Sequence, residues 1–254
     1  MASVFITGGA TGIGAASVRK FAADGFDVAV FDINADAVQQ LASEGYAGSI
    51  SYFETDVRQR DEVRASVAAA AVKLGAPSAL FVNAGIQKLA GIFEMEDEDI
   101  DAIIDINLKG ALYTVAEVAA LMRDAGAGGA IVLMSSDQAL VGKEGSIVYG
   151  ATKGAVAQMA KSLSMALVEY DIRVNAVCPA TVKTPLTEQV FQWIADRHFS
   201  GDKDAAWAAE AKTLPIGRVA APEEIAEVVY FLTQPTSSFM TGALVPVDGG
   251  LTAQ

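Results

Sequence analysis

The chain has 254 residues, of which 52% are hydrophobic, and its formal net charge at pH 7 is -13. That length is enough to bury a full core without disulfides or structural metals, and so acidic a chain is a poor partner for nucleic acid or an anionic membrane. Only one histidine (His198) and one cysteine (Cys178) are present, so we expect no metal site. A lone cysteine and an N-terminus without a signal sequence predict a cytoplasmic protein.

Strands and helices are expected to alternate along the chain. Apolar runs bounded by turn residues predict strands at 4–7, 28–31, 49–55, 79–82, 130–134, 172–177 and 243–247. Helical patterns lie at 58–74, 97–123, 150–170 and 186–214, and Pro222 opens a last helix. This alternation predicts a single α/β domain over 1–254. We expect a doubly wound parallel sheet of Rossmann type, with about seven strands and helices on both faces.

The first expected strand runs into a glycine-rich turn. Its glycines, Gly8, Gly12 and Gly14, are spaced Gly-x-x-x-Gly-x-Gly, with Thr11 and Ile13 between them. Residues without a Cβ atom let a pyrophosphate approach the backbone, and the helix that follows offers free N–H groups to the anion. These five residues are therefore predicted to bind a dinucleotide. A plain tight turn between a strand and a helix is the alternative.

Asp32 follows the second expected strand. A carboxylate at that point accepts a hydrogen bond from a ribose 2′-hydroxyl and repels a 2′-phosphate. The glycine turn and the stretch 32–40 contain no Arg or Lys that could hold such a phosphate, so NAD is predicted in preference to NADP. The alternative role for Asp32 is to cap the next helix, which the sequence Asn34-Ala35-Asp36 begins.

Tyr149 and Lys153 are four residues apart in a segment of helical character, so their side chains share one helix face. A phenol has a reference pKa near 10, and a neighbouring ammonium group favours its phenolate form. The pair is a candidate general acid/base for an alcohol oxygen, and Ser136, after the apolar run 130–134, is a candidate to hydrogen-bond the same oxygen. An exposed Tyr and Lys on an ordinary helix is the alternative.

Together these motifs resemble the short-chain dehydrogenase/reductase family over nearly the full length of the chain. The matching residues are 7–14, Asp56-Val57, Asn83-Ala84-Gly85, Asn107, Ser136, Tyr149, Lys153 and 179–184. In that family the catalytic serine precedes the tyrosine by about a dozen residues, a spacing that Ser136 fits better than Ser135.

The resemblance implies a role for each catalytic residue. Tyr149 would be the acid/base, and Lys153 would lower the pKa of Tyr149 and bind the ribose hydroxyls of the cofactor. Ser136 would orient the substrate oxygen. Asn107 would hold a water that relays protons to Lys153, although a buried asparagine that caps a helix irregularity is the structural alternative.

The resemblance also implies contacts to the cofactor. Asp56 and Val57 would touch the adenine, and the Asn83-Ala84-Gly85 motif would lie at the adenosine-side ribose. Val182 and Thr184 would fix the nicotinamide carboxamide.

Two features of the C-terminal half bear on the substrate side. Ala180 departs from the family, which usually has Gly after Pro179, and a positive φ there would cost an alanine about 1 kcal/mol. The helix-rich segment 186–214 is similar to the mobile substrate lid of the family, with a fixed oligomer contact as the alternative.

Gln87, Gln138 and Lys143 follow the Asn83 and Ser136 motifs and predict an unusually polar pocket wall. Such a wall suits hydroxyls or a carboxylate better than a steroid, and Gln87 is similar to a residue of the small hydroxy-acid members of the family. The alternative is that the residues after Ser136 form a solvated loop.

We therefore predict an NAD-dependent oxidoreductase that transfers a hydride between nicotinamide and the secondary alcohol or ketone of a polyol, sugar derivative or hydroxy acid. An enzymatic alternative is a 3-oxoacyl thioester reductase, which should prefer NADPH and carry a basic surface at the pocket mouth. A non-catalytic dinucleotide-binding sensor or scaffold is the alternative of another class, but it does not require the four predicted catalytic residues together.

The resemblance further implies a homotetramer. The helices at 97–123 and 150–170 would form its interfaces, where small side chains permit close packing. Those side chains are Ala155, Ala157, Ala160 and Ser164.

Overall fold

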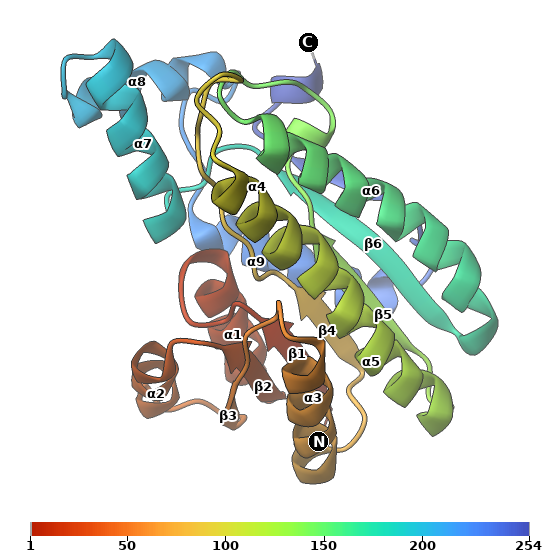
Figure 1. Ribbon diagram of the computed structural model, residues 1–254. Coiled ribbons are helices and arrows are strands. Elements are labelled where there is room, and N and C mark those ends of the chain that lie inside the picture. Colours follow the sequence, from red (N-terminus) through yellow and green to blue (C-terminus); the bar gives the residue numbers. More distant parts are fainter. Residues whose placement is uncertain (1, 254) are drawn as a thin grey trace.

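The computed structural model describes residues 2–253 and contains a seven-stranded parallel sheet with helices on both faces (Figure 1). The strands are β1 (Ser3–Thr7), β2 (Asp27–Asp32), β3 (Ile50–Glu54), β4 (Ala79–Val82), β5 (Gly129–Met134), β6 (Ile172–Pro179) and β7 (Leu244–Val247). Their order across the sheet is β3-β2-β1-β4-β5-β6-β7, and every neighbouring pair is parallel. The predicted fold class is confirmed.

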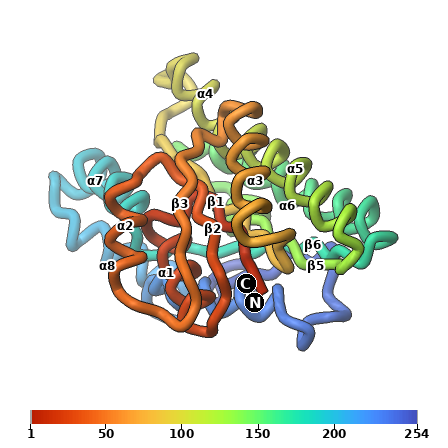
Figure 2. Tube along the Cα trace, turned by 90° about the horizontal axis from the view of Figure 1, so that it is seen from below, coloured from red at the N-terminus to blue at the C-terminus, as the bar shows by residue number. Residues whose placement is uncertain are grey.

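Helices cover both faces of this sheet. They are α1 (Gly12–Ala23), α2 (Ala35–Ser43), α3 (Arg60–Leu74), α4 (Asp97–Ile104), α5 (Ala111–Ala125), α6 (Ile147–Leu167), α7 (Pro185–His198), α8 (Lys203–Thr213) and α9 (Pro222–Thr233). Helices α3, α5 and α6 pack on one face, and α1 and α9 pack on the other (Figure 2). Helices α7 and α8 form a separate pair beyond the ends of the strands (Figure 1).

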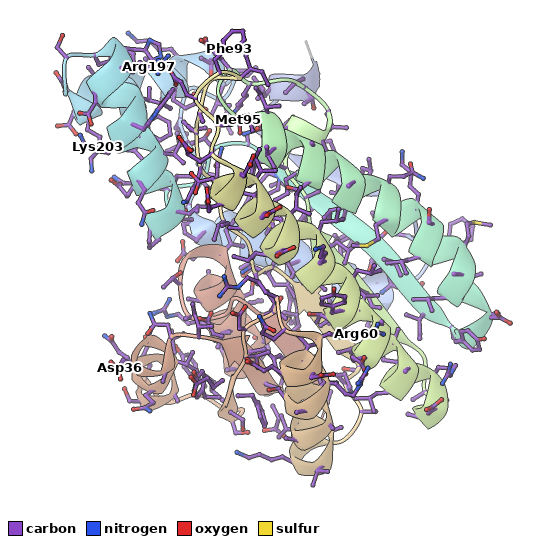
Figure 3. All side chains as sticks on the ribbon, viewed as in Figure 1. Asp36, Arg60, Phe93, Met95, Arg197 and Lys203 are labelled. Carbon is purple, nitrogen blue, oxygen red and sulfur yellow. The ribbon has the colours of Figure 1, made fainter. Side chains whose placement is uncertain are left out.

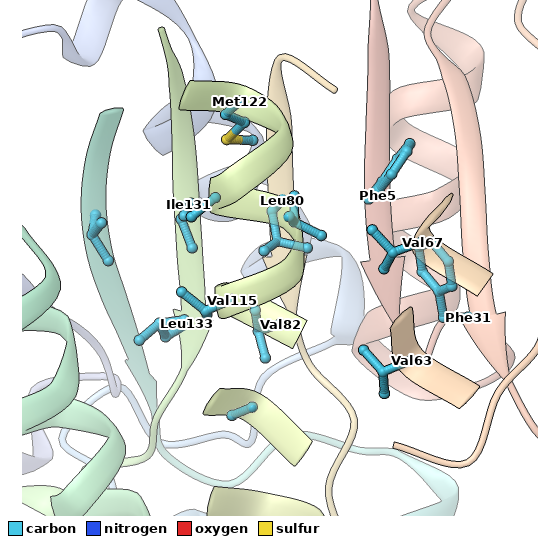
Figure 4. Close-up of a cluster of buried hydrophobic side chains, with 14 of the residues drawn as sticks. Phe5, Phe31, Val63, Val67, Leu80, Val82, Val115, Met122, Ile131 and Leu133 are labelled. Carbon is cyan, nitrogen blue, oxygen red and sulfur yellow. The ribbon is translucent and has the colours of Figure 1, made fainter. Parts of the chain in front are cut away.

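Each face of the sheet has its own apolar core. On the α3/α5/α6 face, Phe5, Leu80 and Ile131 from three strands are fully buried and meet Val115 and Met122 of α5 (Figure 4). Burying one side chain of this size contributes about 1.5–3 kcal/mol. Because the inner strands are buried on both faces, their sequences are continuous apolar runs rather than alternating ones.

The expected single helix over 97–123 is interrupted. A π-helical segment, Asp105–Gly110, separates α4 from α5. Such a bulge turns one extra residue inward, and here it brings Asn107 to the sheet side, where it is 2% exposed. The irregularity around Asn107 that we weighed as an alternative is therefore present, and the sequence pattern alone showed only helix.

The chain reverses its direction across the sheet between β1 and β4, which lie side by side although two strands separate them in sequence. Ligands of such sheets bind beyond the carboxyl ends of the strands at this switch point.

Ala180, just beyond β6, is not strained, because Asp171 and Ser200 are the only non-glycine residues with positive φ among residues 2–253. None of the helices in that range is both long and apolar enough to cross a membrane.

Candidate active site

A cavity of about 550 Å³ opens at the carboxyl ends of the strands. It brings together nearly all the residues that the sequence analysis selected, which are Gly8, Thr11, Gly12, Ile13, Asp32, Asp56, Val57, Asn83, Ala84, Gly85, Gln87, Ser136, Gln138, Lys143, Tyr149, Lys153, Val182 and Thr184. Gly14 and Asn107 do not line the cavity and act on it from behind. One cleft therefore connects the predicted dinucleotide site with the predicted catalytic group.

The glycine turn is built so tightly that side chains are excluded. A Cβ atom on Gly14 would lie 2.0 Å from the carbonyl oxygen of Gly8, and one on Gly8 would lie 2.7 Å from Cα of Ala84. Gly8 and Gly12 also have positive φ (64° and 55°). The side-chain amide of Asn83 donates to the Gly8 carbonyl oxygen at 2.8 Å and fixes the turn against the end of β4. This cradle leaves the N-terminus of α1 open to an anion.

Asp32 is held by backbone donors at the far end of the cleft. The N–H of Ala10 donates to its Oδ2 at 2.9 Å, and the N–H of Asn34 donates to its Oδ1 at 3.0 Å. The side chain of Asn34 caps α2 by accepting from the N–H of Ala37 at 3.2 Å. Asn34 rather than Asp32 therefore caps α2, and Asp32 lines the cavity.

Arg58 is a cation of the cavity wall that the sequence analysis missed. Its guanidinium forms an ion pair with Asp56 (2.6 Å), and both residues line the cavity. Hydrogen bonds from Arg58 hold the pKa of the Asp56 carboxyl below its ordinary value. Arg58 directly follows the Asp56-Val57 motif in the sequence, and this position could have indicated a cation near the adenine. The cofactor prediction considered only the cations of the glycine turn and of the residues after Asp32.

Lys153 lies deep in the cleft at 3% exposure. Its ammonium nitrogen donates to the carbonyl oxygen of Met134 at 2.8 Å and lies 5.4 Å from the centroid of the Tyr149 ring. Burial lowers the pKa of Lys153 to about 8. Helix α6 supplies both residues, so the expected sharing of one helix face is confirmed.

The pKa of Tyr149 differs from the expectation. Burial raises the pKa of this phenol above its ordinary value, the nearby Ser136 hydroxyl partly offsets that rise, and the charge of Asp137 adds to it. The ammonium of Lys153 donates to the Met134 carbonyl oxygen, and the desolvation of the phenol dominates the pKa of Tyr149. Sequence reasoning counted the cation next to the phenol but not the desolvation of both groups.

The two serines after β5 have different partners. The hydroxyl of Ser135 donates to the carbonyl oxygen of Lys153 at 2.8 Å. The hydroxyl of Ser136 donates to Oδ1 of Asp137 at 2.7 Å and accepts from the N–H of Gln138 at 3.2 Å. These two contacts fix the orientation of the Ser136 hydroxyl at the cleft.

Asn107 fixes the loop after β4 from behind the cavity. Its Oδ1 accepts from the N–H of Ile86 at 2.8 Å and its Nδ2 donates to the Ile86 carbonyl oxygen at 2.9 Å. A Cβ atom on Gly85 would lie 3.2 Å from Asn107 Oδ1 and 3.6 Å from Nζ of Lys153. Gly85 therefore lies next to both the amide and Lys153, and both polar atoms of the amide hold the loop.

The substrate end of the cleft contains a charged cluster. The Lys143 ammonium lies 3.0 Å from Oδ2 of Asp137 and 3.4 Å from Oε1 of Glu210 on α8, and that oxygen also accepts from the hydroxyl of Thr181. On the opposite wall the amide of Gln87 donates to the Ser146 hydroxyl at 3.0 Å. The sequence analysis missed Glu210 and gave no role to Thr181 within the motif 179–184, since no local pattern links α8 to the catalytic loop.

These features define a Rossmann-type dinucleotide-binding oxidoreductase. The sequence profile of a family described as enoyl-(acyl carrier protein) reductase matches residues 8–252. The chain is 34% identical to the 3-oxoacyl-[acyl-carrier-protein] reductase of Thermotoga maritima over 248 residues, which cover 97% of this chain and 96% of that protein.

Solved structures agree with this assignment. A short-chain dehydrogenase family protein of Francisella tularensis is 35% identical with a TM-score of 0.88, and the match covers 100% of both chains. Ligand-free aldohexose dehydrogenase of Thermoplasma acidophilum is 30% identical with a TM-score of 0.88, over 100% of this chain and 94% of that one. The protein belongs to the short-chain dehydrogenase/reductase family, whose members use a nicotinamide cofactor.

Proposed function

We propose that this protein is an NAD-dependent oxidoreductase that interconverts the secondary alcohol and ketone of a small polar substrate. The observation that carries the proposal is the convergence of Ser136, Tyr149 and Lys153 in a cleft whose other end holds Asp32. A dinucleotide extended from Asp32 past the glycine cradle would end beside Tyr149.

The chain's own groups account for the cofactor contacts. Asp32, bound by two backbone N–H groups, is an acceptor for ribose hydroxyls, and its charge disfavours a 2′-phosphate. Asp56 and Val57 would contact the adenine, and Val182 and Thr184 would contact the nicotinamide carboxamide; all four residues line the cleft. When bound, the nicotinamide supplies or accepts the hydride.

Proton movement falls to the residues around Tyr149. Ser136 would hold the substrate oxygen, and Tyr149 would take its proton during oxidation or return it during reduction. Lys153 would bind ribose hydroxyls, and charged Lys153 released from the Met134 carbonyl would stabilise the phenolate. Asn107 would support this group by holding the loop at Gly85 and Ile86.

The polar wall of the cleft supports a polyhydroxy substrate. Gln87 and Gln138 offer amide groups, while Lys143 is shared between Asp137 and Glu210. One cation between two carboxylates leaves the cluster with one net negative charge, which disfavours a carboxylate beside Ser136. Among the predicted substrates we therefore rank polyols and sugars above hydroxy acids, and the name of the Thermoplasma relative agrees.

The second candidate is a 3-oxoacyl thioester reductase. The name of the Thermotoga relative favours it, because 34% identity extends over 97% of this chain. Asp32 at the ribose end and the acidic cluster at the substrate end speak against the NADPH and the acidic carrier that such an enzyme would use.

A substrate screen distinguishes the two candidates. Purified protein is assayed with NAD and NADP against polyols, aldoses and their matched sugar acids, and with NADPH against acetoacetyl-coenzyme A, following absorbance of the reduced cofactor. The proposal expects NAD-linked oxidation of neutral polyhydroxy compounds. Efficient NADPH-linked reduction of the thioester would select the second candidate instead.

Two features of the assembly complete the proposal. We propose that residues 186–214 form a substrate lid, since α7 begins at the cleft residues Pro185 to Thr187. An ion pair joins Arg197 of α7 (Figure 3) to Glu94, which lies between β4 and α4 (3.1 Å). We also propose a homotetramer through α4 to α6, where Leu112 and Ile147 are about half exposed (48% and 46%). The predicted contact through Ala157, Ala160 and Ser164 is wrong, because these three side chains are buried within the protomer. Light scattering of the purified protein tests the tetramer.

A further inference from the structure

The connection between α8 and the catalytic loop depends on one lysine. Lys143 faces Asp137 on one side and Glu210 on the other, at 3.0 and 3.4 Å. Burial by itself would lower the pKa of Lys143, but the two carboxylates outweigh burial and raise it, so the ammonium stays charged at neutral pH. Asp137 is 2% exposed, and a carboxylate this deeply buried needs a charged partner.

Both carboxylates have a second role at the cleft. Oδ1 of Asp137 accepts the only proton of the Ser136 hydroxyl. Oε1 of Glu210 accepts from the hydroxyl of Thr181, which lies in the loop between β6 and α7. A continuous path of polar contacts therefore runs from Ser136 through Asp137, Lys143 and Glu210 to α8 and the loop at Thr181.

We propose that Lys143 and Glu210 are positioning residues that couple the docking of α8 to the orientation of the Ser136 hydroxyl. With α8 in place, Glu210 holds Lys143, Lys143 holds Asp137, and Asp137 fixes the orientation of the Ser136 hydroxyl. Ser136 then keeps one fixed orientation at the cleft. When α8 moves away, Lys143 loses one of its two partners and Asp137 and Ser136 lose a fixed geometry.

The role of Ser136 in this proposal rests on the proposed function, but the contact with α8 does not. Two variants remove the connection without changing side-chain size, Lys143→Met and Glu210→Gln. Lys143→Arg keeps the charge and tests rescue. The matched control is Lys203→Met, because Lys203 of α8 pairs with Glu188 of α7 at 2.8 Å at a distance from the cleft.

Hydrogen exchange of residues 203–213, followed by mass spectrometry, measures the docking of α8 without any substrate. We expect exchange to rise about tenfold in Lys143→Met and in Glu210→Gln, the ratio for loss of one charged hydrogen bond. The double variant should add little to either single change, and Lys143→Arg should restore protection. Unchanged exchange in both single variants would overturn the coupling.

Kinetics with a substrate found in the screen measures the orientation of Ser136. We expect Lys143→Met and Glu210→Gln to lower kcat about tenfold with a smaller change in KM, while Lys203→Met leaves kcat unaltered and Lys143→Arg recovers it. An equal loss of kcat in Lys203→Met without a rise in the exchange of residues 203–213 would show an effect that does not pass through the docking of α8, and it would contradict the proposal. If no alcohol is oxidised, the proposed function fails while the exchange result still decides the contact.

Discussion

The two ends of the cleft are constructed differently. At the dinucleotide end the contacts come from backbone groups and short motifs that directly follow β1, β2 and β4, as in the N–H groups that hold Asp32. At the substrate end they come from side chains far apart in sequence, such as Lys143 and Glu210. The first end is rigid and recognisable in a short stretch of sequence, while the second depends on charges that only folding brings together.

The cleft also contains two lysines whose pKa values are shifted in opposite directions. Lys153 is buried against a carbonyl oxygen and its pKa is lowered to about 8. Lys143 is largely enclosed between two carboxylates and its pKa is raised. The comparison shows that the partner, rather than burial alone, decides the direction in which the pKa of a lysine shifts.

Tyr149→Phe should have the largest effect on activity. It should change catalysis at the substrate end of the cleft and leave binding at the dinucleotide end unchanged. Loss of the phenolic proton should lower kcat by roughly 10²- to 10⁴-fold, the usual contribution of a general acid/base. Titration of the same variant with NADH, followed by fluorescence, should give the parent dissociation constant. Tyr170→Phe, outside the cleft, is the control, and turnover equal to the parent in Tyr149→Phe would remove that residue from the mechanism.

Lys153→Met tests the burial of the deeper lysine through stability. The unfolded chain keeps the Lys153 proton up to about pH 10.5 and the folded chain only up to about pH 8. Between these values the unfolded state binds more protons, so the free energy of unfolding contributed by Lys153 rises with pH. The parent should gain about 3 kcal/mol over the variant across that window, since each pKa unit is worth about 1.4 kcal/mol.

Urea unfolding at pH 7.5 and at pH 10 measures this difference, which develops over most of the window. Comparison with the variant cancels the contributions of other groups that titrate there. If the free energy of unfolding changes equally with pH in the parent and in the variant, burial does not lower the pKa of Lys153.

Asp32→Ser tests the dinucleotide end. Loss of a charged acceptor should shift the ratio of NAD to NADP affinity by roughly tenfold to a hundredfold toward NADP. Asp36→Ser is the matched control, because Asp36 lies nearby on the outer side of α2 (Figure 3) and does not line the cavity. If the ratio is the same in Asp32→Ser and in the parent, another group determines the cofactor preference. Arg58, a cation of the cavity wall, would then be the next residue to test.

Ala180→Gly should have the smallest effect. Because the alanine adopts negative φ without strain, glycine offers no relief and only adds freedom to the unfolded chain, so we expect a loss of about 0.4–1 kcal/mol. Gly217→Ala provides the contrast, since Gly217 has φ of 78° in open space and an alanine there is strained. Thermal unfolding measures both changes, and a more stable Ala180→Gly would mean that the loop needs a glycine after all.

The sequence by itself determined the alternation of strands and helices, the parallel sheet and the residues that follow each strand. It could do so because buried parallel strands are continuous apolar runs, and because parallel strands bring their carboxyl ends to one edge. Gly8, Asp32, Asn83 and Ser136 therefore converge wherever the sheet forms. The same logic found nearly every residue of the dinucleotide end.

Tertiary structure decided what no local pattern records. The π-helical segment at Asn107 looks like ordinary helix in the sequence, since only the packing of the helix against the loop at Ile86 requires the extra residue. The pKa of Tyr149 follows from desolvation, a property of the enclosed cleft rather than of the Tyr-x-x-x-Lys spacing. The link from Glu210 to Lys143 exists because α8 folds back over the strand ends, which brings together charges that are distant in sequence.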